Sequence, residues 1–147
     1  LNAHSEPVNF SDIILKINER RSNDIYVGCD SHKKSGVYIF AVVIALHLKG
    51  NGGTFFFYRN RSKDKQLDNI HIRLMKETEL TLRIARKIQE QISDRSIHVH
   101  LDINPKTIYA SSIVLPSAVS WVKSCGFTPS VKPDAWASSC LADAFAR

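Results

Sequence analysis

Four acidic residues stand at positions where the surrounding pattern predicts apolar side chains. Asp30 ends one predicted strand, and Asp102 lies near the end of another. Glu77 falls inside the apolar stripe of a long predicted helix, whereas Glu79 lies about half a turn away at a repeat of ~3.6 residues. Asp143 shares a helical face with bulky residues near the end of the chain. A carboxylate that faces a sheet is costly unless something positive binds there.

These carboxylates could act together at one edge of a sheet. If the strands of Asp30 and Asp102 run parallel and adjacent, both side chains emerge at the carboxyl end, where open α/β sheets bind ligands. Clustered carboxylates disfavour each other's charged form and therefore call for a cation. Hard oxygen ligands select Mg²⁺ or Mn²⁺, and two such ions can activate water against a phosphodiester. We predict that Asp30, Glu77 and Asp102 hold such an ion.

The last predicted helix offers two candidates for a fourth ligand. Asp143 lies on the face of Trp136 and Cys140, which we expect to contact the sheet. Asp134 follows Pro133 at the start of the helix, where Asp is a favoured N-cap. Capping, in support of the site, is the simpler interpretation of Asp134, but the residues alone leave both candidates open.

His98, His100 and Asp102 alternate along one predicted strand, so their side chains project from one face. The pattern H-x-H-x-D is similar to that of zinc hydrolases, but a zinc site needs three or four converging ligands and no second histidine cluster exists. A zinc hydrolase is therefore the least favoured interpretation. We expect half-buried histidines bonded to neighbours, with His100 as a supporting group that tunes Asp102.

The formal net charge is +6 and the isoelectric point is near 9.4, which favours a polyanionic partner. Several lysines follow the acids closely in the sequence, and we predict that they contact the phosphates of RNA or DNA. These lysines are Lys33 and Lys34 after Asp30, Lys106 after Asp102, and Lys132 before the last helix. Residues 59–65 add a further basic run.

Apolar periodicity predicts the elements that position these residues. An opening helix to about residue 21 precedes an antiparallel meander of three strands, with turns at HKKSG and KGNGG. A helix from 66 to about 93, a strand at 96–103, a helix at 113–125, a strand at 127–132 and a helix from 134 follow. Right-handed crossovers then give an α/β fold with a mixed five-stranded sheet and helices on both faces.

Length and composition fit one globular domain over residues 1–147, with residues 1–22 as an N-terminal helical extension. The three cysteines form no CxxC pair, which argues against a disulfide framework or a zinc knuckle. The longest apolar run, 37–48, is too short to cross a bilayer. We expect a cytoplasmic protein.

Several segments resemble the YkuK family of predicted ribonuclease H-related nucleases. They are VGCDSHKKSG, HLKGNGGTFFFYR, HVHLDINP, WVKSCGF and, most specifically, VKPDAWASSCLAD. The resemblance covers residues 26–143 and implies a ribonuclease H-like fold. It also implies that the acidic ligands are Asp30, Glu77, Asp102 and Asp143, which favours Asp143 over Asp134. The family usually continues with a basic residue and a histidine, where this chain has Ala144 and Phe145.

We therefore expect a metal-dependent nuclease of the ribonuclease H-like class that hydrolyses RNA or DNA with Mg²⁺ or Mn²⁺. The alternative from another class is a nucleic-acid-binding module that keeps the fold without turnover.

Overall fold

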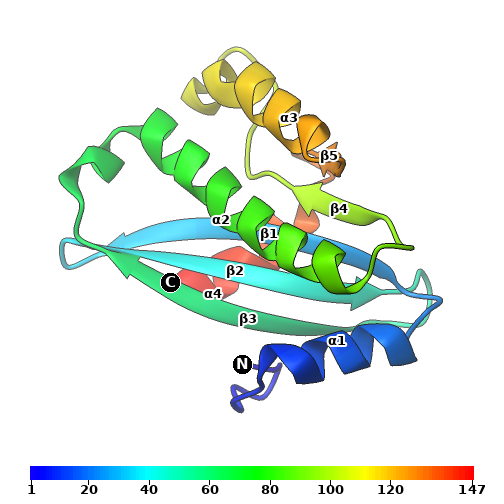
Figure 1. The fold of residues 1–147 in the computed structure, drawn as a ribbon. Helices are drawn as coiled ribbons and strands as arrows, with labels where there is room; N and C mark the ends of the chain where they lie inside the picture. Colours follow the sequence, from blue (N-terminus) through cyan, green and yellow to red (C-terminus); the bar gives the residue numbers. More distant parts are fainter.

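The computed structural model describes residues 1–147 as a five-stranded sheet flanked by helices (Figure 1). The main elements are α1 (Phe10–Glu19), β1 (Asp24–Lys34), β2 (Val37–His47), β3 (Gly53–Ser62), α2 (Ile70–Gln91), β4 (Ile97–His100), α3 (Leu115–Ser124), β5 (Thr128–Ser130) and α4 (Asp143–Ala146). Two 3-10 helices, η1 (Lys65–Asp68) and η2 (Ala110–Val114), precede α2 and α3, and a π-helical stretch, η3 (Ala137–Ala142), runs into α4. No helix is long and apolar enough to cross a membrane.

The sheet has the order β3-β2-β1-β4-β5. Strands β1 to β3 form the predicted antiparallel meander, and β4 and β5 join parallel to β1 through helical crossovers. The sheet is therefore mixed, as the alternation of strand and helix patterns predicts. This topology places the end of β4 beside the middle of β1, at Gly28.

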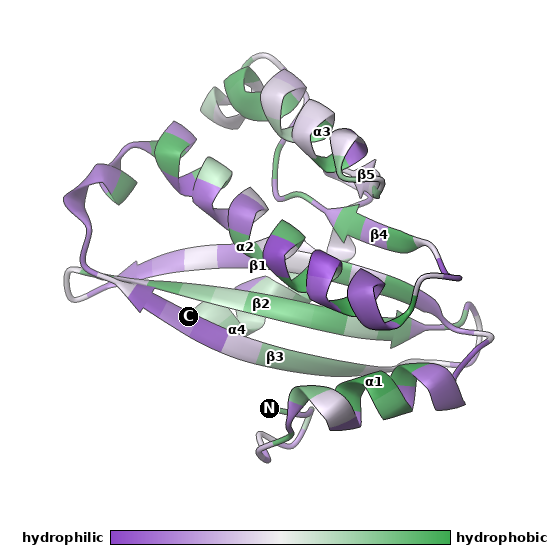
Figure 2. Ribbon diagram, in the orientation of Figure 1, coloured by the Kyte–Doolittle hydropathy of each residue, from purple (hydrophilic) through white to green (hydrophobic).

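The larger core lies between the sheet and the helices α1, α2 and α3. Alternate residues of β2, from Tyr38 to Leu46, face this side and are buried, and the apolar stripe of α2 covers them. Leu80 and Ile88 of α2 are fully buried there, and Ile17 brings α1 into the same cluster of 27 buried residues. The hydropathy colouring shows apolar residues along β2 and along α1 beside it (Figure 2).

The opposite face of the sheet carries only η3 and α4, drawn in red behind the strands in Figure 1. Its buried apolar cluster contains four residues, Val43, Ala45, Phe57 and Ala142. Partly buried aromatic side chains complete it, and Phe145 of α4 stacks on Phe57 with ring centroids 3.9 Å apart. This second face is held by far less buried apolar surface than the first.

One glycine decides how closely this second layer approaches. A Cβ on Gly28 of β1 would lie 2.7 Å from the backbone nitrogen of Ser138 and 2.8 Å from the carbonyl carbon of Ala137. Real Cβ atoms do not come this close to backbone, so η3 can contact β1 here only because residue 28 has no side chain.

The structure departs from the predicted elements most clearly at three places that bear on the acids. Strand β1 continues to Lys34, so that most of HKKSG is strand and only Ser35 and Gly36 form the turn. Strand β4 ends at His100 rather than at residue 103. The last helix begins at about Trp136 rather than at Asp134, and Asp134 accepts no hydrogen bond from its first turn, so the predicted N-cap role of Asp134 is wrong.

Candidate functional site

Asp30 and Asp102 lie where β1 and β4 part. The parallel ladder between these strands ends at the pair Gly28 and His100, two residues before each acid. Beyond that point β1 continues along β2, whereas the chain after β4 turns toward β5, with the Leu101 N–H donating to the Ser130 carbonyl over 2.8 Å. Both acids thus lie just beyond the point where the parallel pairing of two adjacent strands ends, although Asp30 is still within β1.

Asp30 is half-buried and has unfavourable electrostatic surroundings for a charged carboxylate. Burial raises the pKa of Asp30 to about 7, and the nearby carboxyl groups of Asp102 and Asp143 act in the same direction. The backbone N–H of Ser31 donates to Asp30 Oδ1 over 2.8 Å and opposes this rise. Carboxyl groups from two other segments therefore act electrostatically on Asp30.

Glu77 lies on the inward side of α2 with 5% of its surface exposed. Ser31 Oγ donates to Glu77 Oε1 over 2.5 Å, which ties α2 to β1 beside Asp30. Burial raises the pKa of Glu77 well above its usual range, and the charges of Asp30 and Asp102 add to the rise. The same helix thus holds a buried carboxyl group close to both strand-end acids.

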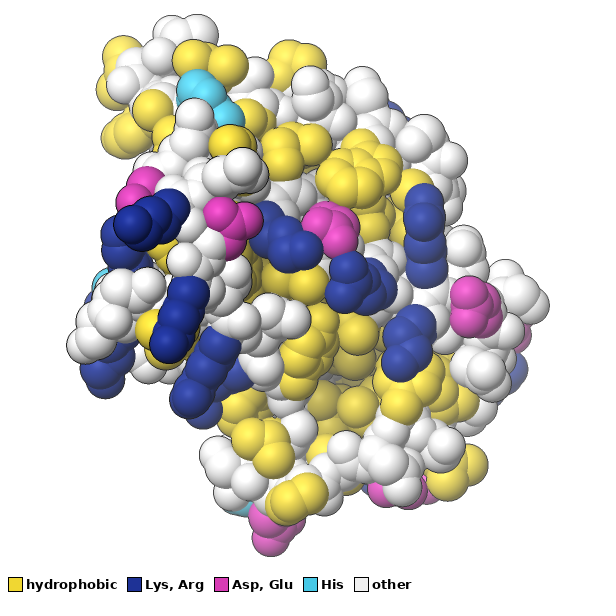
Figure 3. All heavy atoms as spheres, turned by 60° about the vertical axis from the view of Figure 1, so that its left-hand side comes forward, with side chains coloured by type: hydrophobic (Ala, Val, Ile, Leu, Met, Phe, Trp, Pro, Cys, Tyr) yellow, Lys and Arg dark blue, Asp and Glu magenta, His cyan; other side chains and the backbone are white.

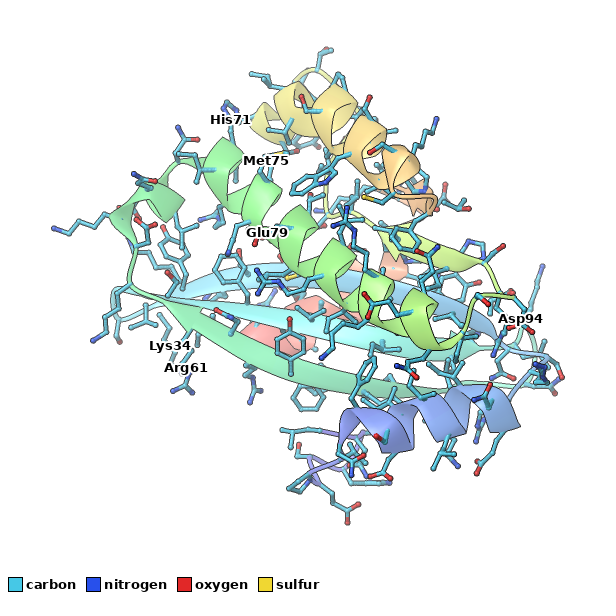
Figure 4. All side chains as sticks on the ribbon, in the orientation of Figure 1. Lys34, Arg61, His71, Met75, Glu79 and Asp94 are labelled. Carbon is cyan, nitrogen blue, oxygen red and sulfur yellow. The ribbon has the colours of Figure 1, made fainter.

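Glu79 differs sharply from Glu77, although it lies only two residues further along α2. It pairs with Lys76 over 2.9 Å and with Arg83 over 2.6 Å, and the Lys76 hydrogen bond lowers the pKa of Glu79. Figure 4 shows Glu79 on the outer side of α2. The predicted distinction between an inward Glu77 and a surface Glu79 therefore agrees with the placement of both residues.

Asp102 is largely covered, with 16% of its side chain exposed. Its Oδ1 lies 2.8 Å from Lys132 Nζ but outside the angular range of a hydrogen bond, so this buried oxygen has charge complementarity without a directed donor. Burial alone would lower the pKa of Lys132, but Asp102 overrides that effect and raises it.

Asp143 opens α4, directly after the π-helical stretch. It forms an ion pair with Arg147 over 2.9 Å, and its carboxyl group contributes to the raised pKa of Asp30. Asp134 instead lies exposed in the turn before the helix and does not appear among the charges that act on Asp30. Of the two candidates for a fourth ligand, the structure brings only Asp143 to the other acids.

His100 supports a different element from the one predicted. No hydrogen bond joins it to Asp102; its Nδ1 accepts the backbone N–H of Ala137 over 3.0 Å, at the start of η3. Burial lowers the pKa of His100 to about 4, with His98 adding to the effect, so the ring stays neutral and can accept. His100 therefore fixes the helix that carries Asp143.

The lysines do not all surround the acids as the sequence suggested. Because β1 continues past Asp30 at about 3.3 Å per residue, Lys33 and Lys34 lie roughly 10–13 Å along the strand. Lys33 pairs with Asp68, which also accepts a hydrogen bond from the Tyr38 hydroxyl. Lys33 and Lys34 therefore lie further along the hairpin than Asp30, and their contact with phosphates stays a prediction.

Lys106 and Lys132 do lie together near Asp102. They line an open hollow of about 460 Å³ with Asn104, Pro105, Pro133 and Ser139. Lys132 already faces Asp102, so Lys106 is the cation that is free to meet a phosphate here.

Sequence reasoning missed two residues that shape the site. Ser31 donates to Glu77, and strand alternation could have placed it, since it projects to the face opposite Asp30. Gly28 allows η3 to contact β1. The signal in the sequence was the glycine itself, because a glycine inside an apolar strand often marks a close approach of another backbone.

The four acids have the donor chemistry for a hard divalent cation, although they do not form a finished site. No group of three or more His, Cys, Asp or Glu side chains is arranged to hold a metal ion, and this includes His98 and His100 of the zinc interpretation. Yet Asp102 Oδ1 is buried without a hydrogen-bond donor, and burial and neighbouring carboxyl charges raise the pKa values of Asp30 and Glu77 despite the cations nearby. A cation bound by these oxygens would meet both needs.

Comparison with known proteins gives one match. No curated protein and no solved structure matches the chain. A family model described as ribonuclease H-like matches residues 10–147, which confirms the resemblance to the YkuK family and agrees with the mixed sheet described above. The chain belongs to the ribonuclease H-like family.

Proposed function

We propose that this protein is a metal-dependent nuclease that hydrolyses phosphodiester bonds of RNA or DNA. Asp30, Glu77, Asp102 and Asp143 would hold Mg²⁺ or Mn²⁺, and His100 would keep the helix of Asp143 in place. One observation carries the proposal: Asp30 of β1 and Glu77 of α2 lie close enough to Asp102, after β4, that burial and the Asp102 charge together raise the pKa of both. Family membership and the net charge of +6 support a nucleic-acid substrate.

The residues of this chain would prepare the site in three ways. Ser31 holds the Glu77 carboxyl group beside Asp30, and Lys132 pairs with Asp102 over 2.8 Å. With a pKa of about 7, Asp30 loses its proton near neutral pH and becomes a stronger ligand as pH rises. A bound divalent ion would supply Lewis-acid activation of water and neutralise charge on the scissile phosphate.

A non-catalytic nucleic-acid-binding module is the second candidate. The observation in its favour is the ion pair between Lys132 and Asp102, because Lys132 already supplies a positive charge to one carboxylate of the set. In such a module the lysine would serve in place of a metal ion, and the remaining acids would be neutral when buried.

Cleavage assays separate the two candidates. We expect labelled single strands, duplexes, hybrids or junctions to be cut in Mn²⁺ or Mg²⁺ and left intact in EDTA. Asp30→Asn and Asp102→Asn should reduce the rate by at least about a hundredfold, as losses of groups that stabilise transition-state charge do. Binding without metal-dependent cleavage, unchanged in both variants, would establish the module instead.

The two glutamates of α2 provide a matched control. Glu77→Gln should abolish cleavage, whereas Glu79→Gln removes the same charge from the same helix and should leave the rate within about twofold, as expected for an exposed residue whose ion pairs contribute little. Equal losses in both variants would show that the effect comes from the helix rather than from the site.

A further inference from the structure

The face of the sheet that carries α4 continues beyond the acids toward the tip of the β1–β2 hairpin. The register pairs Asp30 with Ala41 and Ala41 with Arg59, so these residues form a row across three strands on this face. The following residues on the same face are, by register and alternation, His32, Ile39 and Arg61 in the next row, then Lys34 and Val37.

These rows form a shallow trough, which we call the hairpin trough. It is an open hollow of about 450 Å³ lined by Lys34, Ser35, Val37, Ile39, Arg61, Ser62 and Lys63. Val37 and Ile39 of the middle strand form an apolar, half-buried floor. Lys34 on one side and Arg61 with Lys63 on the other form charged rims, about two strand spacings or roughly 10 Å apart.

The positive charge of the hairpin trough is uncompensated. Lys34, Arg61 and Lys63 are exposed and form no ion pair, and no acidic residue lines the hollow. Neighbouring Lys33 is different, because it faces the side of α2 and pairs with Asp68. Figure 4 shows Lys34 and Arg61 together at this end of the molecule, far from Asp94, and Figure 3 shows Lys and Arg side chains gathered where this end comes forward.

The geometry points to the hairpin trough as a track for one nucleic-acid strand that leads to Asp30. This inference rests on the proposed function and adds a substrate class, single-stranded nucleic acid, to it. The trough is about 10 Å wide, room for one sugar–phosphate backbone but not for both strands of a duplex. Alternate residues of β3 stand about 7 Å apart, similar to the spacing of consecutive phosphates along an extended strand.

The chemistry of the trough favours binding without sequence preference. Lys34, Arg61 and Lys63 can contact phosphates, which carry no sequence information, and the aliphatic floor can pack against sugars and base edges. Because such binding releases counterions, it should weaken steeply as salt rises.

Binding measurements in EDTA with Asp30→Asn as the background test the track without any need for cleavage. The probes are a fluorescein-labelled single strand of about 16 nucleotides, a length that spans one binding site, and the duplex of the same sequence. The variant Lys34→Ala with Lys63→Ala should weaken single-strand binding about tenfold near 0.1 M salt and reduce the slope of log K against log salt by about 1.4.

The matched control removes two lysines elsewhere. Lys49 and Lys123 are exposed and form no ion pair, and neither lines the hairpin trough. Lys49→Ala with Lys123→Ala should leave both affinity and slope nearly unchanged. Equal losses in the two variants, tighter binding of the duplex, or no binding of the single strand would each overturn the track. Selective binding without cleavage in metal-loaded wild-type protein would sustain the track and overturn the nuclease.

Discussion

The two faces of the sheet divide stability and chemistry between them. The face under α1, α2 and α3 buries a cluster of 27 apolar residues, whereas the face under η3 and α4 buries four. Glu77 enters from the thick side, but Asp143 and the hairpin trough belong to the thin side. A thin layer leaves strand surface open to a ligand, and the thick layer compensates for the stability that the thin one lacks.

A cavity in the thick layer should have the largest effect on stability. Leu80→Ala removes a fully buried side chain from the cluster and should lower the free energy of unfolding by about 2–5 kcal/mol. Phe145→Ala on the thin side, where the side chain is half exposed, should cost clearly less. Urea unfolding of both variants measures the difference. A larger loss from Phe145→Ala would reverse the assignment of the two faces.

Gly28→Ala tests the close approach of the thin layer. The added methyl group would meet the backbone of Ala137 and Ser138, so η3 must move away from β1. We expect the free energy of unfolding to fall by about 1–3 kcal/mol, as it does at other overpacked sites. Hydrogen exchange should quicken at η3 and α4 while amides of α2 keep their protection. If amides in both layers lost protection against exchange equally, the two faces of the sheet would not be independent in stability.

The raised pKa values predict how pH acts on the metal-free protein. Asp30 binds its proton more tightly in the folded protein, where its pKa is about 7, than at its ordinary value of 3.8. Protonated Asp30 therefore adds to the free energy of unfolding in full below about pH 4, and this stabilisation is lost as pH rises through 7. In EDTA, the free energy of unfolding of the wild-type protein should fall by about 1–2 kcal/mol more than that of Asp30→Asn between pH 5 and 8. This value allows for the partial exposure of Asp30, and urea unfolding at each pH measures it.

Divalent cations should reverse that loss. At pH 8, Mn²⁺ or Mg²⁺ at a hundred times its dissociation constant should stabilise wild-type protein by about 2.7 kcal/mol, and Asp30→Asn by much less. Thermal unfolding with and without EDTA gives the comparison. A cation effect of equal size in Asp30→Asn would place the ion elsewhere.

The smallest of these effects should come from the hydrogen bond between His100 and Ala137. His100→Leu leaves a buried N–H without an acceptor and should cost about 1 kcal/mol or slightly more. His100→Asn, whose side-chain oxygen can accept, should recover part of the loss. Since His100 acts on the helix of Asp143, cation affinity should follow the same order as stability. Equal affinities in wild type and His100→Leu would show that the helix is held without this bond.

Sequence patterns identified the sheet, its mixed topology and the placement of Glu77, because each depends on local periodicity and on the rules for crossovers. They failed where a distant partner decides the outcome. His32 to Lys34 read as a loop because they are polar, yet the apolar residues of β2 across from them keep them in the strand. The sequence predicts Asp134 as the N-cap of the last helix, but His100 accepts the N–H of Ala137 at the start of that helix instead. Neither partner is visible within a short window of sequence.

The π-helical stretch before Asp143 has a consequence for tolerance to deletion. A π-helix bonds each residue to one five positions away, whereas an α-helix uses four. Losing one residue between Ala137 and Ala142 could therefore be absorbed by conversion to ordinary α-helix, with Asp143 kept on its present side. The same loss within α2 would rotate every later residue of that helix by about 100° and turn its buried stripe toward solvent.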